Sequence, residues 1–235
     1  MTHSDKQVQA DHVCGHAKLP NTRTHVCERY FHEHAANLEF IIMVMGLAHR
    51  IDKRERKILD LVKPVISIEK YQSWQQNIDN SSATEQMEQH KRRYFEMLLC
   101  REVDNYLVYI SELLADIFRA KPETLRSGEM VRLDTVLRHG TMKDLINELA
   151  DRRVHELSYS GLKDLSVYFK EKLGLSLFQG ESDEQHAVQI IEQRNLIVHA
   201  RSVVNPLFLR KIPNSTIGVG ELLPFGRKTG SHSCY

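Results

Sequence analysis

The feature that most constrains the fold is a long apolar repeat between Glu85 and Ala120. Apolar residues in this segment recur every three or four positions, which is the spacing of one face of an α-helix. The repeat consists of Phe95, Leu99, Val103, Tyr106, Ile110, Leu113, Leu114 and Ile117. Pro122 follows and cannot continue a helix, because it has no backbone N–H group. We therefore expect one helix whose buried face covers roughly six turns.

The rest of the chain repeats this pattern in shorter segments and predicts an all-α fold. Helices are expected over residues 28–50, 54–68, 131–156, 158–173 and 184–205. Thr141 is expected to begin a new helix within the segment 131–156, Gly174 to end the next helix, and Asp183 to cap the last one. Residues 71–82 are rich in turn-forming residues and predict a polar loop. The glycine-rich and proline-rich segment after Asn205 predicts a short irregular arm or strand.

These elements divide the chain into four predicted parts. Residues 1–27 are polar and histidine-rich, without a sustained period, and are expected to form a leader. Residues 28–80 are expected to form an N-terminal helical pair, residues 81–212 a helical bundle domain, and residues 213–235 a polar tail.

Composition limits the classes of protein to which the chain can belong. The 32 Lys and Arg residues nearly balance the 31 Asp and Glu residues, so no global positive field attracts nucleic acid. Any RNA contact would need a local basic patch. The longest uncharged apolar run, residues 40–47, is too short for a membrane span, and no secretory signal pattern opens the chain. We expect a cytoplasmic protein.

Cysteine and histidine near the start of the chain raise the question of zinc. The four cysteines are too few and too scattered for a disulfide framework, which fits a reducing compartment. Cys14, His16, Cys27 and His32 are residue types that zinc prefers, but they lack the paired C-x2-C or H-x3-H spacing of a standard finger. A zinc-dependent nucleic-acid binder is the weakest of three hypotheses, and no metal or cofactor is predicted.

Polar residues interrupt the apolar stripe of the last strong helical segment. At about 100° per residue, one stripe of the segment 184–205 contains Ala187, Ile190, Ile191, Ile197 and Val198. Arg194 falls within this stripe, and a core-facing arginine keeps its charge and needs partners there. Asn195 and His199 lie one turn apart along the flank of the stripe. A fixed positive charge, an amide and a titratable imidazole together suit chemistry on a phosphodiester.

The segment Arg194-Asn195-Leu196-Ile197-Val198-His199 resembles the R-x4-H motif of HEPN domains. These domains form a helical superfamily rich in metal-independent ribonucleases of toxin, antiviral and RNA-processing systems. The apolar helix before the motif, its continuation over residues 200–205 and the preceding segment 162–178 look like the last two helices of such a domain. The resemblance implies that residues 81–212 form a HEPN-like bundle.

The resemblance also implies a reaction and a role for each polar residue. The reaction would be cleavage of single-stranded RNA by attack of the ribose 2′-hydroxyl on the adjacent phosphorus, without a metal. His199 would transfer a proton, Arg194 would neutralise phosphate oxygens, and Asn195 would orient His199 or the phosphate. In many relatives an acidic residue on an early helix faces the active turn, so either Glu102 or Asp104 could hold Arg194.

Partners follow from the same reasoning. One histidine cannot readily act as acid and base on opposite sides of the phosphorus, and the resemblance implies a homodimer with a composite active site. Its interface would include residues 184–205. Further RNA-binding candidates are Lys91, Arg92, Arg93 and Arg201. An antitoxin or another regulatory protein would be an additional partner.

Two main hypotheses therefore stay open. The first is a ribonuclease that acts as a toxin or in defence against phage, which the intact Arg194, Asn195 and His199 favour. The second is a non-catalytic HEPN module that binds nucleotide or RNA, or regulates a partner through its N-terminal helices, with Arg194 serving only to fix the fold. The chain has no P-loop, G-x-G-x-x-G, H-E-x-x-H or G-x-S-x-G motif, which excludes most nucleotide hydrolases, metalloproteases and serine hydrolases.

Overall fold

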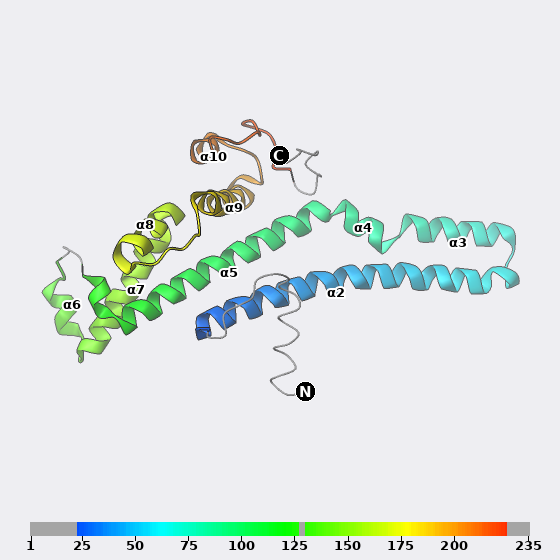
Figure 1. Ribbon diagram of the computed structural model, residues 1–235. Helices are drawn as coiled ribbons and strands as arrows, with labels where there is room; N and C mark the ends of the chain where they lie inside the picture. Colours follow the sequence, from blue (N-terminus) through cyan, green and yellow to red (C-terminus); the bar gives the residue numbers. More distant parts are fainter. Residues whose placement is uncertain (1–22, 127–129, 225–235) are drawn as a thin grey trace. The chain divides into compact units, whose positions relative to one another are not determined.

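A computed structural model describes residues 23–126 and 130–224 and shows an all-α fold, as predicted. The elements are α2 (His25–Val62), the 3-10 turn η1 (Lys63–Val65), α3 (Ile68–Asn80), α4 (Ala83–Gln89), α5 (Lys91–Ala120), the 3-10 turn η2 (Pro122–Leu125), α6 (Leu133–Arg138), α7 (Met142–Ser160), α8 (Leu162–Leu173), α9 (Glu181–Ala200) and α10 (Pro206–Lys211) (Figure 1). Extended pairing in the described residues is limited to an isolated antiparallel bridge between Val203 and Leu222. No helix in this described part of the chain has the length and apolar composition of a membrane span.

The chain divides into two compact units. Among the described residues, the first unit contains residues 31–102 and 223–224, and the second contains residues 23–30, 103–126 and 130–222. Both α2 and α5 contribute residues to both units.

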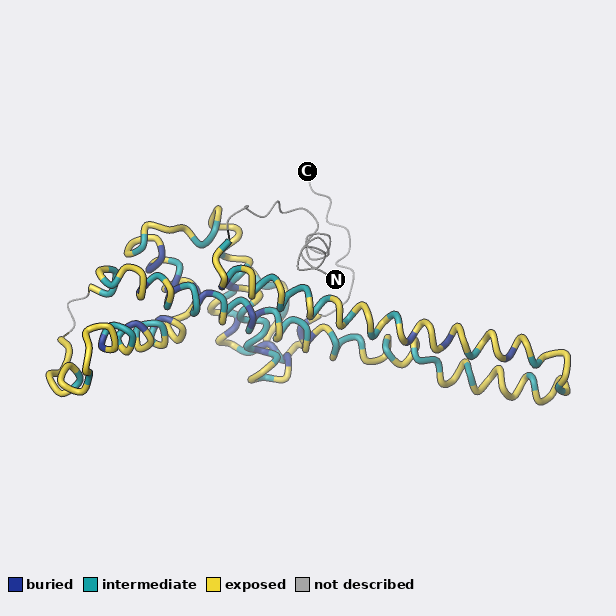
Figure 2. The backbone as a smooth tube through the Cα atoms, turned by 90° about the horizontal axis from the view of Figure 1, so that it is seen from below, coloured by how far each residue is buried: buried dark blue, intermediate teal, exposed yellow. Residues whose placement is uncertain are grey.

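In the first unit, α2 runs antiparallel to α3, α4 and the start of α5 and forms a helical hairpin with them (Figures 1 and 2). Buried positions on α2 include Ala48, Asp52 and Leu59, which recur at helical spacing, while most other side chains of the hairpin are exposed or half-buried. A single helix replaces the two predicted helices over residues 28–50 and 54–68, so the predicted break was wrong. No glycine or proline lies at residues 51–53, where the break was expected, and α2 continues to Val62, next to η1 and its Pro64.

The predicted loop over residues 71–82 was also wrong, because α3 occupies most of it. The Ser67 side chain accepts a hydrogen bond from the Lys70 backbone N–H and caps this helix. Apolar residues then recur at helical spacing up to Ile78. Asn and Asp residues near the end of the segment suggested a turn, but their unfavourable helix propensity is small enough to be outweighed.

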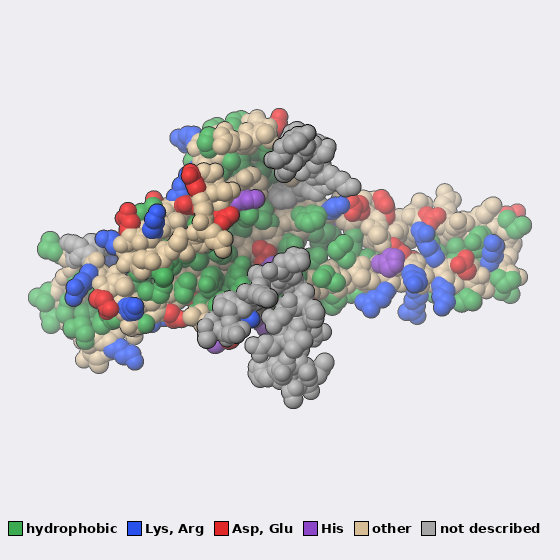
Figure 3. Space-filling model, viewed as in Figure 1, with side chains coloured by type: hydrophobic (Ala, Val, Ile, Leu, Met, Phe, Trp, Pro, Cys, Tyr) green, Lys and Arg blue, Asp and Glu red, His purple; other side chains and the backbone are tan. Residues whose placement is uncertain are grey.

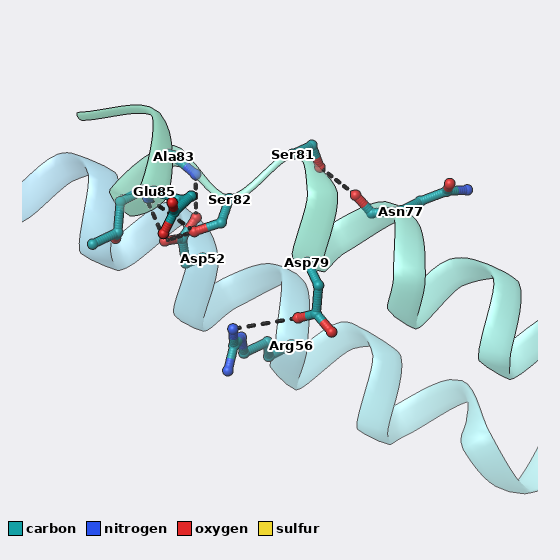
Figure 4. Close-up of polar contacts among 9 residues, drawn as sticks. Asp52, Arg56, Asn77, Asp79, Ser81, Ser82, Ala83 and Glu85 are labelled. Carbon is teal, nitrogen blue, oxygen red and sulfur yellow. Dashed lines mark hydrogen bonds and ion pairs between the residues drawn. The ribbon is translucent and has the colours of Figure 1, made fainter. Parts of the chain in front are cut away.

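Asp52 connects α2 to the beginning of α4 (Figure 4). Its carboxylate accepts hydrogen bonds from Ser82 Oγ at 2.9 Å and from the backbone N–H groups of Ala83 at 2.7 Å and Thr84 at 3.0 Å. Ser82 in turn caps α4 by accepting from the Glu85 backbone N–H at 3.2 Å. The Thr84 side-chain hydrogen bond is the largest cause that lowers the pKa of Asp52 to about 2, with the other hydrogen bonds adding to it and burial opposing it.

In the second unit, α5, α7, α8 and α9 surround one apolar core. Its buried members are Ile110, Leu114, Phe118, Ala150, Leu157, Leu162, Leu165, Tyr168, Phe169 and Val188. The rings of Phe118 and Tyr168 meet edge to face with their centroids 6.1 Å apart. This core packs α8 against α7 and α9 and thereby fixes α9 in the unit.

Two predicted helix boundaries in the second unit are confirmed. Thr141 caps α7 by accepting from the Asp144 backbone N–H at 3.1 Å, and Gly174 ends α8 with a φ of 67°. α8 begins later than predicted, at Leu162, because α7 continues to Ser160 and Gly161 (φ 94°) separates the two helices.

The boundaries of the motif helix and the segment after it differ from prediction. The residue at the N-cap position of α9 is Gly180 rather than Asp183, and the helix ends at Ala200 rather than near residue 205. Asn205 then caps α10 by accepting from the Phe208 backbone N–H at 2.9 Å, and Pro206 is its first residue. A short helix therefore replaces the expected irregular arm up to Lys211.

The Asp52 carboxylate yields a stability prediction. We expect Asp52→Ala to destabilise the first unit by about 2 kcal/mol, because it removes a helix cap and leaves backbone N–H groups without an acceptor. The folded pKa of about 2 lies below the ordinary value of 3.8, so this stabilisation is present above about pH 4 and is lost as the pH falls through 2. Trp74, the single tryptophan, lies in α3 and reports unfolding of this unit by its fluorescence.

The matched variant is Asp52→Asn, which keeps an acceptor but cannot ionise. Urea titrations at several pH values between 5 and 2 should show a smaller loss of stability with acid for Asp52→Asn than for the natural chain. Equal losses in both proteins would contradict the assigned role of the carboxylate.

Candidate functional site

The motif residues of α9 meet at one groove of the second unit. Arg194, Asn195 and His199 all line this groove, which has a volume of about 770 Å³. Its other walls come from α5, the end of α7, the start of α8 and α10. The further lining residues are Leu107, Ile110, Ser111, Leu114, Leu157, Ser158, Tyr159, Ser160, Gly161, Leu162, Lys163, Asp164, Leu165, Val188, Ile191, Glu192, Arg210 and Lys211. The groove thus has an apolar floor and a polar, partly basic rim.

Arg194 is held in a fixed direction by two side chains. Its Nε and Nη2 atoms donate to Asp104 Oδ1 at 3.1 and 2.8 Å, and Nη1 donates to Asn195 Oδ1 at 3.3 Å. A guanidinium has five N–H groups, so these three bonds leave about two donors for another acceptor. The Arg194 side chain is 23% exposed, which allows an anion in the groove to reach those donors. Asp104 and Asn195 therefore orient the Arg194 guanidinium without using all of its N–H donors.

Of the two acidic candidates on α5, Asp104 is the one that contacts Arg194. Within the first unit, Glu102 instead accepts from Asn37 Nδ2 at 2.8 Å and lies 2.7 Å from His34 Nδ1. Residues two positions apart on a helix point about 200° away from each other, so Glu102 and Asp104 face different sides of α5.

His199 is exposed at the end of the motif helix. It lies in the last turn of α9, lines the groove and makes no hydrogen bond with any residue that the structure describes. Its imidazole is therefore available to a ligand for proton transfer.

The chain turns sharply directly after His199. Arg201 and Ser202 have positive φ angles of 51° and 66°, and the Ser202 N–H group donates to the Leu196 carbonyl at 2.9 Å. The left-handed conformation costs about 1–2 kcal/mol for a non-glycine residue. Backbone hydrogen bonds of Val204 with Glu221 and Gly220, both 2.8 Å long, hold the chain beyond the turn. The helix end that carries His199 is thus anchored by contacts outside the helix.

The buried face of α9 differs from the predicted apolar stripe. Val188 and Leu196 are buried, although neither belonged to that stripe. Ile190 and Val198 did belong to it, but they are 37% and 50% exposed. The prediction was wrong in this part because apolar residues occur on more than one side of the helix, and periodicity alone does not say which side meets the core.

Two further basic residues at the groove were missed by the sequence analysis. Lys163 and Arg210 line it, and neither forms an ion pair within the described part of the chain. Lys211 also lines it but pairs with Glu192 at 2.6 Å, which joins α10 to α9. The signal for α10 was Asn205 followed by Pro206, a common start of a helix.

The predicted RNA-binding cluster at the start of α5 is compensated by acidic neighbours. Lys91 pairs with Glu88 at 2.7 Å, and Arg92 and Arg93 pair with Glu96 at 2.8 and 3.0 Å. This cluster lies in the first unit and contributes nothing to the lining of the groove in the second. Arg201 is exposed in the turn after α9 but is also not among the lining residues.

The zinc hypothesis gains no geometric support. Cys27 and His32 lie on α2, whereas Cys14 and His16 lie outside the described residues. Burial is the main cause that raises the pKa of the Cys27 thiol, which disfavours the thiolate that binds zinc. Within residues 23–126 and 130–224, no three His, Cys, Asp or Glu side chains gather as a metal site would require.

Comparison with known proteins adds no family assignment. No family model matches the chain, and no curated protein or solved structure is significantly similar to it. The HEPN resemblance therefore stays a prediction that rests on the motif residues and their surroundings.

The Arg194–Asp104 pair predicts a measurable effect on the arginine itself. We expect Asp104→Ala to speed hydrogen exchange of the Arg194 Nε–H by up to about fivefold, because a partly exposed ion pair contributes about 0.2–1 kcal/mol. Exchange can be followed by nitrogen-15 NMR of the arginine side chains. Glu102→Ala is the control and should leave the Arg194 signal unchanged. Equal exchange in the natural chain and in Asp104→Ala would contradict the pairing.

Proposed function

We propose that the protein is an endoribonuclease that cleaves single-stranded RNA through its own side chains, as a toxin or a phage-defence effector. The observation that carries this proposal is the convergence of Arg194, Asn195 and His199 on one groove, with Arg194 oriented by Asp104. An arginine with donors to spare and an imidazole without a hydrogen-bond partner in the described chain supply what phosphodiester cleavage requires.

The proposed reaction is an intramolecular transfer at phosphorus. His199 takes the proton from the ribose 2′-hydroxyl, and the 2′-oxygen forms a bond to the adjacent phosphorus. The bond from phosphorus to the 5′-oxygen breaks, and this oxygen receives a proton. The products are a 2′,3′-cyclic phosphate and a free 5′-hydroxyl. Arg194 stabilises the charge that builds on the non-bridging oxygens.

Proton delivery to the leaving oxygen requires a second acid. His199 of a second copy would provide it, as the HEPN resemblance implies, because acid and base act on opposite sides of the phosphorus. Asn195 fits the positioning role, since its Oδ1 accepts from Arg194 and its Nδ2 is available to hydrogen-bond a phosphate oxygen.

The rim of the groove suits a single-stranded polyanion. Lys163 and Arg210 form no ion pair with a described acidic side chain, and they can contact phosphates on either side of the scissile one. Tyr159 is 80% exposed at the same groove and offers an aromatic face on which a base can stack.

The direct test is cleavage of end-labelled single-stranded RNA in EDTA. We expect the natural chain to leave 2′,3′-cyclic phosphate ends. His199→Ala and Arg194→Ala should each lower the rate by at least about a hundredfold, the lower end for a positioned proton-transfer group. His186→Ala is the matched control, because His186 is exposed on the same helix but does not line the groove.

The same experiment separates the alternative function. A folded chain that binds the RNA in the groove without cutting it would support a non-catalytic RNA-binding or regulatory module. Cleavage that persists in His199→Ala and Arg194→Ala would contradict the assigned site.

A further inference from the structure

A flank of α2, beside the face that packs in the first unit, carries a second apolar stripe. Its members recur at intervals of three or four residues, with Arg54 at the one position that is not apolar. They are Phe40, Met43, Leu47, Ile51, Ile58 and Leu61. Their exposed fractions range from 44% for Leu47 to 68% for Leu61. The stripe lies about 100° round the helix from the buried Ala48 and Leu59, so the described part of the first unit covers one apolar side of α2 and leaves the other open.

The length and spacing of the stripe are those of a helix-packing surface. Intervals of three and four residues allow side chains of two parallel or antiparallel helices to interlock along their lengths. From Phe40 to Leu61 the stripe is about 32 Å long at 1.5 Å per residue. Single exposed apolar residues are ordinary, but a continuous row of this length marks an interaction surface.

The distribution of charge along α2 indicates that a second copy of the same helix covers the exposed stripe. Residues 31–48 contain two acidic residues, Glu33 and Glu39, and no Lys or Arg. Residues 49–62 contain five basic residues and three acidic ones. Lys and Arg side chains are gathered along this part of the hairpin in Figure 3. Antiparallel pairing of two α2 helices places each basic half beside the acidic half of the other copy, whereas parallel pairing places the like charges together.

We propose that two chains associate through the α2 stripe, antiparallel, about a two-fold axis beside Leu47. In this register the two Leu47 side chains meet, and Met43 of each copy faces Ile51 of the other. Glu39 of one copy then lies within a turn of Arg54 of the other, and neither residue has an ion-pair partner in the described part of its own chain. Such an interface is self-complementary and closes as a dimer. It lies within the first unit and does not rest on the proposed ribonuclease activity.

The test is the mass of the full chain in solution, measured by sedimentation velocity between about 1 and 100 μM, the range of a moderate-affinity dimer. We expect the natural chain to self-associate. Leu47→Glu should lower the measured mass, because it brings two carboxylates together on an apolar surface. Met43→Glu is a second disrupting variant, because it places a carboxylate against Ile51 of the other copy. Ile42→Glu is the control, because Ile42 is 63% exposed on the same helix but lies about 140° from the stripe. Circular dichroism confirms that each variant is folded.

Exchanging the charges of Glu39 and Arg54 tests whether the two α2 helices pair antiparallel. Glu39→Arg should weaken the dimer at least tenfold in Kd, and adding Arg54→Glu to the same chain should restore it. Failure of the double exchange to restore the dimer would overturn the antiparallel register.

Two results would overturn the inference as a whole. One is a monomeric natural chain over the whole concentration range. The other is a mass that neither Leu47→Glu nor Met43→Glu lowers, which would place any contact outside the α2 stripe. RNA cleavage measured on the same variants reports the proposed function separately.

Discussion

The ion pair between Asp104 and Arg194 is the interaction on which the candidate site depends. It joins α5 to α9 across 90 positions of sequence, with a shortest N–O distance of 2.8 Å. Both side chains are partly exposed, so the pair contributes little to stability by itself. The core formed by Ile110, Leu114 and Val188 brings the two helices together, and the ion pair then fixes the direction of the guanidinium. Packing thus provides the position of the site, and the ion pair provides its orientation.

The end of α9 complements this arrangement. Arg201 and Ser202 stop the helix one residue after His199, in a conformation that non-glycine residues adopt only when other contacts hold it. The bonds from Val204 to the segment at residues 220–221 supply those contacts. An oriented arginine and an exposed imidazole five residues later therefore face one groove, and Lys163 and Arg210 extend its positive rim. This combination is the physical basis for proposing a phosphodiester substrate.

Sequence periodicity predicted the helical class, the cap at Thr141 and the end of α8 at Gly174, because these depend on local backbone chemistry. It also identified Arg194, Asn195 and His199 as a group, since their spacing on one helix is a local property. It could not choose between Glu102 and Asp104 or find Lys163 and Arg210, because those contacts depend on how distant helices pack. Local propensity predicted the wrong structure at residues 71–82, where Ser67 caps a helix that runs through apparent turn residues.

Binding of a phosphodiester chain in the groove beside α9 is the property on which the proposed function depends. The most direct measurement is NMR of the full chain during titration with a single-stranded oligonucleotide that lacks the 2′-hydroxyl and cannot react. The Arg194 guanidinium and His199 imidazole signals should shift together with the same apparent Kd, and signals of Lys163 and Arg210 should follow. Binding that shifts Lys91, Arg92 and Arg93 but leaves Arg194 and His199 unchanged would contradict the claim.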